Sequence, residues 1–263
     1  MPTKLTALTQ ATILGAADLL YAVVGGNSRA IPALGMAGRN RIINGTGRIN
    51  QRAYVSGTAT TGANQYTLDR WRVVTSGQSL TFTGNDAGRT MTAPAGGVEQ
   101  VIEGANIEGG TYVINWSGTA SCTVDGVSRA KGATFTLTAN TNVTVRFSNG
   151  TFTEVQLEAG TLATPYERVQ IGDELARCQR YYTASIFNIR FTATAASQIQ
   201  ESYIYWPVQM RAAPIVTLDT SGVVNGTATA PTPSIFGART NITSAASGDV
   251  RLLSATVTAN AEL

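Results

Sequence analysis

Residues 155–160, with the sequence Val-Gln-Leu-Glu-Ala-Gly, alternate apolar and polar side chains and end at a glycine. This alternation is typical of a β-strand with one face in a core, and the glycine indicates a turn after it. Asp173 follows as the expected N-cap of one or two helical turns over residues 174–178. Residues 179–182, Gln-Arg-Tyr-Tyr, then begin another extended run. The stretch therefore predicts the end of one β-domain, a short linker helix and the start of a second β-domain.

The residues before this stretch favour a β-sandwich over 39–168. Residues 69–74 alternate with a period of two, and Asp125-Gly126 separates two short β-prone runs, which is a strong hairpin signal. Many short strands with turns at nearly regular spacing are typical of a sandwich or a jelly roll. Further strands are expected at residues 111–116, 122–124, 134–137, 143–147 and 151–157.

The two ends of the chain differ from this central region. Residues 169–263 contain β-prone runs at 203–208, 215–218 and 250–257, which predict a second β-domain. Residues 1–38 contain a short helical pattern at 16–20, a strand at 21–24, a Gly-Gly-Asn-Ser turn and a return strand at 29–31. So small a segment cannot bury its own apolar face, and we expect it to pack on the next domain or on copies of itself. The predicted fold class is all-β, with a small N-terminal anchor (1–38), a central jelly-roll sandwich (39–168) and a C-terminal β-sandwich (169–263).

The composition excludes several classes of function. The 263 residues carry a net charge of +3, but the arginines are scattered and form no basic run, so nucleic-acid binding is not expected. There is no histidine, which rules out a Ser-His-Asp or Cys-His site within the chain and removes the commonest zinc ligand. The most apolar stretch, residues 13–24, is too short to span a bilayer and contains Asp18, so membrane insertion is not expected.

The cysteines and acidic residues do not match a metal motif. Cys122 and Cys178 are far apart and in unlike contexts, so they indicate neither a disulfide framework nor a metal site. Two buried free thiols are the expected state, with a bridge between them as the alternative. Asp86, Asp125 and Glu158 could supply oxygen ligands to calcium, but they lack the spacing of a calcium loop. We therefore expect no metal and no cofactor.

One group of carboxylates is compatible with glycoside hydrolysis, which uses two acids. On a strand, Glu154, Gln156 and Glu158 would project from one face, about 6–7 Å apart at each step. The alternative is that Val155 and Leu157 face the core while the polar residues face solvent or bond to a neighbouring strand. Alternation alone produces this pattern in any sandwich, which favours the alternative. The chain also has no histidine to serve as an acid or base, and it shows no repeat typical of a parallel β-helix. We expect that the protein is not an enzyme.

Several short groups of residues, found in all three regions, match one family in combination. The central groups are Asn44-Gly45, residues 50–52, Tyr66 with Asp69-Arg70-Trp71, residues 110–119 and the junction at 155–168. Together they resemble the jelly-roll carbohydrate-binding modules built into bacteriophage tail-fibre and receptor-binding proteins. Residues 8–29 resemble the N-terminal anchoring segments of such fibres, and residues 203–218 with 259–263 resemble their terminal domain. The resemblance implies a fibre protein of a virion and, because the resembled fibres are threefold, a homotrimer.

Carbohydrate-binding residues are expected among the aromatic side chains that border loops. An aromatic ring can lie on the apolar face of a sugar, while Asn and Arg side chains bind its hydroxyls. The loop at residues 57–64 is the main candidate, since loops often carry function. The candidate residues are Tyr54, Asn64, Tyr66, Arg89 and Asn106. Trp71 and Trp116 lie within alternating strands and are expected to pack in the core instead.

A second aromatic group consists of Tyr181, Tyr182, Tyr203, Tyr205 and Trp206. These side chains could line a receptor surface at the tip of a fibre. Tyrosine and tryptophan are also enriched at subunit interfaces, and we favour an interface for this group. The receptor surface stays open as the alternative.

These observations predict a bacteriophage virion fibre protein that binds a host surface polysaccharide without cleaving it. Assembly in the host cytoplasm is expected because no secretory signal follows Met1. Residues 1–38 would attach the chain to other virion proteins, and several copies of a weak site would act together in adsorption. The alternative is a structural capsid or tail decoration protein, or an adaptor fibre, that does not bind a receptor directly.

Overall fold

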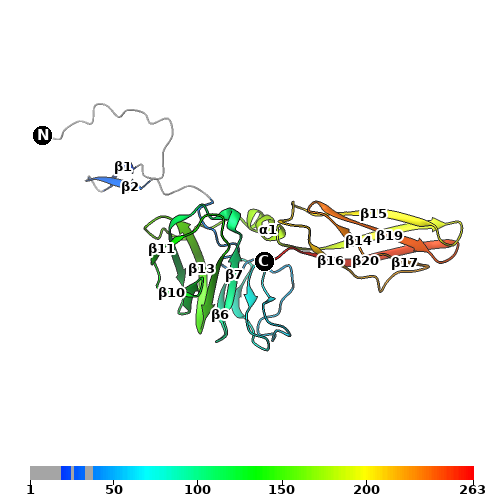
Figure 1. Ribbon diagram of the computed structural model, residues 1–263, viewed down its shortest axis with the longest axis horizontal. Helices are drawn as coiled ribbons and strands as arrows, with labels where there is room; N and C mark the ends of the chain where they lie inside the picture. The colour runs from blue at the N-terminus through cyan, green and yellow to red at the C-terminus, as the bar shows by residue number, and fades with distance from the viewer. Residues whose placement is uncertain (1–18, 25–26, 33–37) are drawn as a thin grey trace, which may run out of the picture. The chain divides into compact units, whose positions relative to one another are not determined.

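The computed structural model describes residues 19–24, 27–32 and 38–263 (Figure 1). The chain divides into two compact units, residues 1–39 and residues 40–263. Within the described residues, antiparallel strands predominate and a single α-helix is present. The prediction of an all-β, sandwich-like fold with one short helix is confirmed.

The described part of the first unit is a hairpin of two strands, β1 (Leu19–Val24) and β2 (Asn27–Pro32). The pairing of Val24 with Asn27 confirms the predicted hairpin. The predicted turn at Gly25 and Gly26 and residues 16–18 of the predicted helical pattern lie outside the described residues. The helical prediction is wrong for Leu19 and Leu20, which belong to β1. They begin an uninterrupted apolar run that ends in two valines, and such a run favours a strand.

The larger unit begins with a sandwich of two antiparallel sheets. One sheet has the strand order β10-β9-β12-β7-β4-β3, and the other has the order β11-β8-β13-β6-β5. Successive strands from β6 to β9 alternate between the sheets, and β6-β13-β8-β11 faces β7-β12-β9-β10, which is the interleaving of a jelly roll. The strands are β3 (Gln65–Tyr66), β4 (Arg72–Val73), β5 (Thr81–Asn85), β6 (Gly88–Ala93), β7 (Val98–Ile102), β8 (Gly110–Ser117), β9 (Ser121–Val124), β10 (Val127–Arg129), β11 (Thr134–Leu137), β12 (Val143–Ser148) and β13 (Gly150–Ala159), with a 3-10 turn η1 (Gly104–Asn106) after β7.

The jelly-roll core is built by the alternation visible in the sequence. In β12, Val143, Val145 and Phe147 are buried, while the residues between them are half-buried. The ring of Phe147 stacks on Phe152 with centroids 4.6 Å apart, and Trp71 meets Phe152 edge-on at 5.2 Å. Trp71 and Trp116 both belong to this core, as predicted. The expected Asp125-Gly126 hairpin between β9 and β10 is also confirmed.

The second part of the larger unit is a smaller two-sheet sandwich that follows the helix α1 (Ile171–Gln179) (Figure 1). Its sheets have the orders β14-β20-β16 and β15-β19-β17, with β18 also paired to β19. Buried residues from both sheets, including Leu252 of β20 and Ile242 of β19, form one core. The strands are β14 (Tyr182–Ala193), β15 (Ile199–Tyr205), β16 (Ile215–Leu218), β17 (Gly226–Ala228), β18 (Thr232–Pro233), β19 (Gly237–Ser244) and β20 (Gly248–Asn260).

The helix and the first strand after it differ in detail from the prediction. The helix begins at Ile171, and Gln170 is its N-cap, so the expected Asp173 cap is wrong. Asp173 instead lies in the first turn, where its charge suits the positive end of the helix dipole. The strand expected at residues 203–208 ends at Tyr205, since Pro207 has no backbone N–H to donate to a ladder.

Both cysteines are buried and free, as expected, and the alternative of a bridge is wrong. Cys122 lies in the jelly-roll core, where burial raises the pKa of its thiol to about 12. Cys178 lies on α1 and is fully enclosed, so burial also raises the pKa of this thiol well above its ordinary value. Both side chains are therefore neutral packing groups at physiological pH.

Candidate functional site

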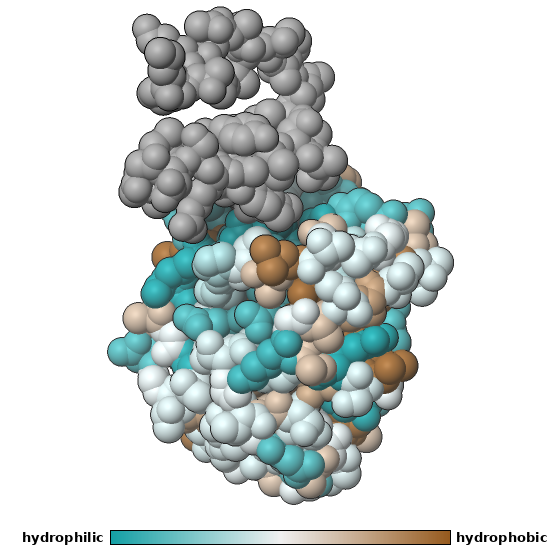
Figure 2. Space-filling model, turned by 90° about the vertical axis from the view of Figure 1, so that its left-hand side faces the viewer, coloured by the Kyte–Doolittle hydropathy of each residue, from teal (hydrophilic) through white to brown (hydrophobic). Residues whose placement is uncertain are grey.

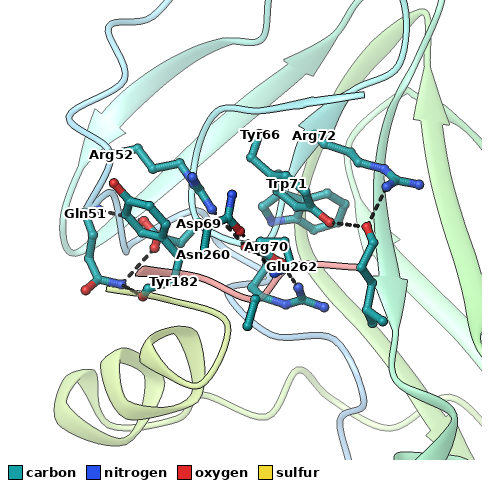
Figure 3. A network of polar contacts seen from close by, with 12 residues as sticks. Gln51, Arg52, Tyr66, Asp69, Arg70, Trp71, Arg72, Tyr182, Asn260 and Glu262 are labelled. Carbon is teal, nitrogen blue, oxygen red and sulfur yellow. Dashed lines mark hydrogen bonds and ion pairs between the residues drawn. The ribbon is translucent and has the colours of Figure 1, made fainter. Parts of the chain in front are cut away.

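Many of the candidate polar and aromatic residues lie in two features of the larger unit. The first is a network that joins the two sandwiches, which we call the junction network (Figure 3). It brings residues 51–72 of the jelly roll against Tyr182 and residues 260–263 of the second sandwich (Figure 3). The second feature is a hollow with exposed aromatic side chains on the second sandwich. Their contacts decide which of the predicted residues are available to a ligand.

Arg70 is the centre of the junction network. Its φ of 71° lies in the left-handed region that arginine rarely adopts, within a tight turn closed by the bond from the Trp71 N–H to the Leu68 carbonyl. The side chain is 1% exposed and forms an ion pair with Glu262, whose side chain is 4% exposed. Burial, the largest single effect, lowers the pKa of Arg70, but the carboxylate of Glu262 together with Tyr181, Tyr66 and Cys178 outweighs it, and the pKa is raised overall. The guanidinium is therefore held charged in a closed site between the sandwiches.

Further contacts of Arg70 connect it to both sandwiches. Its Cζ lies 3.6 Å from the centroid of the Tyr181 ring, and its Nη2 donates to the Val101 carbonyl at 2.5 Å. The Tyr181 hydroxyl in turn donates to Glu103 at 2.9 Å. The N–H of Ala261 donates to the Tyr181 carbonyl at 2.8 Å. One arginine of the jelly roll is thus enclosed by a tyrosine and a glutamate from the second sandwich.

Arg52, Tyr66 and Arg72 extend the network on the jelly-roll side. Arg52 lies 3.6 Å from the centroid of the Tyr182 ring and pairs with Glu262 at 3.2 Å. The Tyr66 hydroxyl donates to the main-chain oxygen of Leu263 at 2.8 Å, and Arg72 Nη1 donates to the same oxygen at 2.6 Å. Burial is the main cause that raises the pKa of Tyr66 to about 12. Tyr66 is therefore a neutral donor engaged inside the chain.

Asn44 links the helix and the jelly-roll core to the same region. Its N–H donates to Glu174 of α1, and its carbonyl accepts the indole N–H of Trp71 at 2.9 Å. Its side chain bonds to the backbone of Ile49 and to the carbonyl of Asp69. Burial raises the pKa of Glu174. The helix is thus fixed to the jelly roll through a buried carboxylate.

Of the five candidate carbohydrate-binding residues, three are already engaged within the chain. Tyr66 belongs to the junction network, and Arg89 is 9% exposed and donates to the carbonyls of Gly47 and Arg48. The Tyr54 hydroxyl lies within hydrogen-bonding distance of the Thr58 and Leu80 carbonyls, at 2.7 and 2.9 Å. These bonds direct the polar groups of Tyr54, Tyr66 and Arg89 inward.

The five residues do not come from one surface element. Tyr54 and Arg89 both contact Phe82. The ring centroids of Tyr54 and Phe82 are 6.4 Å apart, and the Arg89 Cζ lies 5.1 Å from the centroid of the Phe82 ring. Asn64 is exposed in the turn before β3 and has a φ of 56°. Asn106 is exposed at the end of η1, where its N–H bonds to the Glu103 carbonyl.

The second aromatic group divides into buried and exposed members. Tyr181 and Tyr182 are buried in the junction network, and Trp206 is 7% exposed with its indole N–H donated to the Ser234 carbonyl at 3.0 Å. Tyr203 and Tyr205 are 58% and 78% exposed. Their rings stack with centroids 6.4 Å apart and an angle of 26° between the planes. Two of the five aromatic residues therefore form an open surface, and three hold the chain together.

Tyr203 and Tyr205 border a hollow of about 520 Å³, which we call the aromatic pocket. Phe236, 62% exposed, is a further apolar wall. The other lining residues are Ile204, Thr232, Pro233, Ser234, Gly237, Ala238 and Arg239. The pocket combines exposed aromatic rings with a few polar groups, which is the usual composition of a site for a small organic ligand.

The register of the sheet explains how the pocket forms. Tyr203 pairs with Arg239 and Tyr205 pairs with Gly237 across β15 and β19, and β18 continues the sheet on the other side of β19. Tyr203 and Tyr205 are two residues apart on a strand, so they share the outer face while Ile204 enters the core. A Cβ added at Gly237 would lie 2.4 Å from the Ile204 carbonyl, so only glycine fits there.

Backbone hydrogen bonds to the segment after β15 hold Phe236 in place. The carbonyl of Phe236 accepts the N–H of Trp206 at 3.1 Å, and the carbonyl of Ile235 accepts the N–H of Met210 at 2.9 Å. Phe236 and Arg239 were not among the predicted site residues, since they follow a run at residues 228–233 whose Pro, Thr and Ala content is typical of a loop. The available signal was an aromatic residue two positions after the run Pro-Thr-Pro-Ser at residues 231–234.

The carboxylates considered for glycoside hydrolysis are separated by a bulge in β13. The register shifts between Thr153 and Gln156, and Glu154 has a φ of 50° and is exposed. Gln156 and Glu158 are buried, bond to each other at 2.8 Å, and Glu158 also accepts from the N–H and hydroxyl of Thr164. Gln156 and Glu158 therefore fix the segment that follows β13.

Two further hollows are lined mainly by polar and charged residues of the jelly roll, and the first is also lined by Ile171 and Leu175 of α1. One, of about 490 Å³, includes Arg48, Asp86 and Arg89. The other, of about 270 Å³, includes Glu99 and Arg146, which are paired with each other at 2.6 Å. The face of the jelly roll in Figure 2 likewise shows only small, separate hydrophobic patches between hydrophilic residues. Neither of these two hollows is lined by an aromatic ring of the described residues, whereas the aromatic pocket is bordered by two stacked and exposed ones. We therefore take the aromatic pocket as the candidate binding site.

We predict that Asp69 of the junction network titrates above its ordinary range. Burial raises the pKa of Asp69 above 3.8, although Arg52 and the hydrogen bonds from Gln51 oppose the shift. The native state holds this proton more tightly than the unfolded chain does. The stability that the native state gains from the protonated Asp69 is present below pH 3.8. It is lost as the pH rises through the raised pKa of Asp69.

Nuclear magnetic resonance of the side-chain carboxyl carbons can check this prediction. The titration midpoint of Asp69 should lie above that of Asp219, whose pKa is lowered by the hydrogen bonds from Ser221. The variant Asp69→Asn should lose the corresponding fall in stability with rising pH. Equal midpoints for the two aspartates would contradict the prediction.

Among the described residues, no group of three His, Cys, Asp or Glu side chains is arranged to hold a metal ion. No helix in the part of the chain that the structure describes has the length and apolarity needed to cross a bilayer. Comparisons with protein-family models, with curated proteins and with solved structures found no match.

Proposed function

We propose that the chain is a fibre component of a bacteriophage virion that binds a host cell-surface glycan without cleaving it. The virion assignment comes from the groups of residues that resemble tail-fibre and receptor-binding proteins. The assignment of a glycan as ligand comes mainly from the aromatic pocket. Homotrimer formation and attachment through residues 1–38 belong to the same proposal and follow from the resemblance.

The observation that carries the glycan proposal is the exposed Tyr203–Tyr205 pair. A tyrosine that is 78% exposed is not held by packing in the core, and its ring lies beside that of a second exposed tyrosine, with the centroids 6.4 Å apart. Exposed tyrosine rings offer a large contact area at a low entropic cost, because the side chain has only two rotatable bonds. Sugar rings have apolar faces that suit such a surface, and polar groups at its border can bind the hydroxyls.

A structural role is the second candidate, and the junction network favours it. Arg70, Glu262 and Tyr181 fix one sandwich to the other through buried charged and aromatic contacts. A spacer or adaptor requires such a fixed connection, whether or not its surface binds a receptor. Under this view Tyr203 and Tyr205 would contact another subunit, as the initial interpretation favoured.

The proposal predicts that Tyr205→Ala weakens glycan binding about tenfold or more. Loss of an aromatic contact at a binding centre typically costs about 2 kcal/mol or more, and a tenfold change corresponds to about 1.4 kcal/mol. The measurement is binding of the full chain to an array of bacterial surface polysaccharides. The matched control is Ile215→Ala, because Ile215 is also 78% exposed but lies on β16, in the other sheet.

Light scattering of the same two variants separates the candidate functions. Weakened binding by Tyr205→Ala, with binding by Ile215→Ala and the oligomeric state both unchanged, supports the glycan site. Dissociation of an oligomer by Tyr205→Ala would assign the tyrosines to a subunit interface and contradict the site. Failure of the unaltered chain to bind any polysaccharide would contradict glycan binding itself and leave the structural role.

A further inference from the structure

We propose that the aromatic pocket selects uncharged sugars, so that its ligand is a neutral polysaccharide and not one rich in uronic or sialic acids. This inference rests on the proposed function, because it names the class of glycan that the same pocket would bind. It depends on the charges at the border of the pocket and on the hydrogen bonds they can form.

The positive charge of Arg239 at the pocket is balanced by an ion pair with Glu201. Arg239 is the single charged side chain among the residues that line the pocket, all of which lie in the described part of the chain. Its Nη1 lies 3.3 Å from Oε1 of Glu201, and the two side chains are about half exposed. Glu201 lies on β15, two residues before Tyr203. A carboxylate on a sugar would therefore approach Arg239 beside an existing carboxylate.

The hydrogen-bonding capacity of this ion pair suits a hydroxyl group. A guanidinium has five N–H donors, and a carboxylate has several acceptor positions, so both partners keep capacity beyond the bond they share. A sugar hydroxyl can accept from Arg239 and donate to Glu201 at the same time. The ionised carboxylate of a sugar acid can only accept, and it would compete with Glu201 for the arginine.

Within the described residues, the remaining lining adds no positive charge that would attract an acidic group. Thr232 and Pro233 are uncharged, and the Ser234 hydroxyl already donates to the Gly237 carbonyl at 3.0 Å. Tyr203 and Tyr205 offer ring faces, which carry negative electrostatic potential and do not favour an anion. The pocket thus presents apolar stacking surfaces and a neutral donor–acceptor pair.

The test uses the full chain on an array that holds neutral bacterial polysaccharides and acidic ones side by side. The unaltered protein should bind neutral members, with an affinity that changes less than about twofold between low and high salt, because no net charge is neutralised. The variant Glu201→Gln leaves the charge of Arg239 unbalanced. It should bind acidic polysaccharides at least tenfold more tightly than the unaltered protein, with an affinity that falls as salt is added.

The control is Asp249→Asn, which removes another exposed carboxylate paired with arginines but lies outside the pocket lining. It should leave both affinities unchanged. Salt-sensitive binding of acidic polysaccharides by the unaltered protein would overturn this inference and leave the proposed function standing. Failure of the unaltered protein to bind any polysaccharide would overturn both. An unchanged preference in Glu201→Gln would contradict the role given to the ion pair.

Discussion

Replacing Glu262 by alanine is expected to reduce the free energy of unfolding by about 3–5 kcal/mol. The carboxylate pairs with Arg70, whose side chain is 1% exposed, and also with Arg52. Removing it leaves a buried guanidinium without its charge partner, which is far more costly than loss of a surface pair. The charged Arg70 side chain would then need water in place of the carboxylate, and the entry of water would loosen the contact between the sandwiches.

Calorimetry can measure this effect and its location. The unaltered chain should unfold its two sandwiches together, whereas Glu262→Ala should show the second sandwich melting separately at a lower temperature. The control is Asp249→Ala, which removes a carboxylate with two exposed arginine partners and should leave the melting profile unchanged. An unaltered single transition in Glu262→Ala would mean that the junction network does not couple the sandwiches.

Replacing Trp71 by alanine is expected to cost about 3–5 kcal/mol, because it opens a cavity at the centre of the jelly roll. The indole is fully buried, meets Phe152 at 5.2 Å and Phe147 at 6.1 Å, and donates to the Asn44 carbonyl. The cavity would lie next to the residue that fixes α1. Denaturant unfolding followed by circular dichroism would measure the loss.

The two core tryptophans provide a matched comparison for the hydrogen bond. Trp71→Phe removes the donor to the Asn44 carbonyl, which then keeps the bond from the Gly47 N–H, at a cost of about 1 kcal/mol. The indole nitrogen of Trp116 is buried without a partner among the described residues, so Trp116→Phe removes no hydrogen bond. Trp71→Phe should therefore be the more destabilising substitution. Equal losses would contradict the role assigned to the Asn44 bond.

The fold was predictable where a local pattern determines the structure. Alternating residues such as Val145 and Phe147 indicate a half-buried strand without reference to the rest of the chain. The Asp125-Gly126 turn was predictable for a similar reason, since both residues have the positive φ values, 49° and 78°, that such turns require. The helix start was misplaced because a helix can begin without a side-chain cap, as it does at Gln170.

The junction network could not be predicted, because its partners are far apart in sequence. Arg70 and Glu262 are separated by 192 positions, and nothing near either residue indicates the other. Tyr66 borders a loop and was expected to meet a sugar, but its hydroxyl bonds to Leu263 instead. The Tyr203–Tyr205 pair was visible as an aromatic cluster. Its exposure and its proximity to Phe236 depend on the pairing of β15 with β19.

The most direct test of glycan binding at the aromatic pocket is to map the resonances that shift when a bound polysaccharide fragment is added to the isotope-labelled chain. The largest shifts should occur at Tyr203, Tyr205, Phe236 and Arg239, with small changes in the jelly roll. Shifts centred on Tyr54, Phe82 and Arg89, or no shifts in the presence of a fragment that binds on an array, would contradict the assignment of the site.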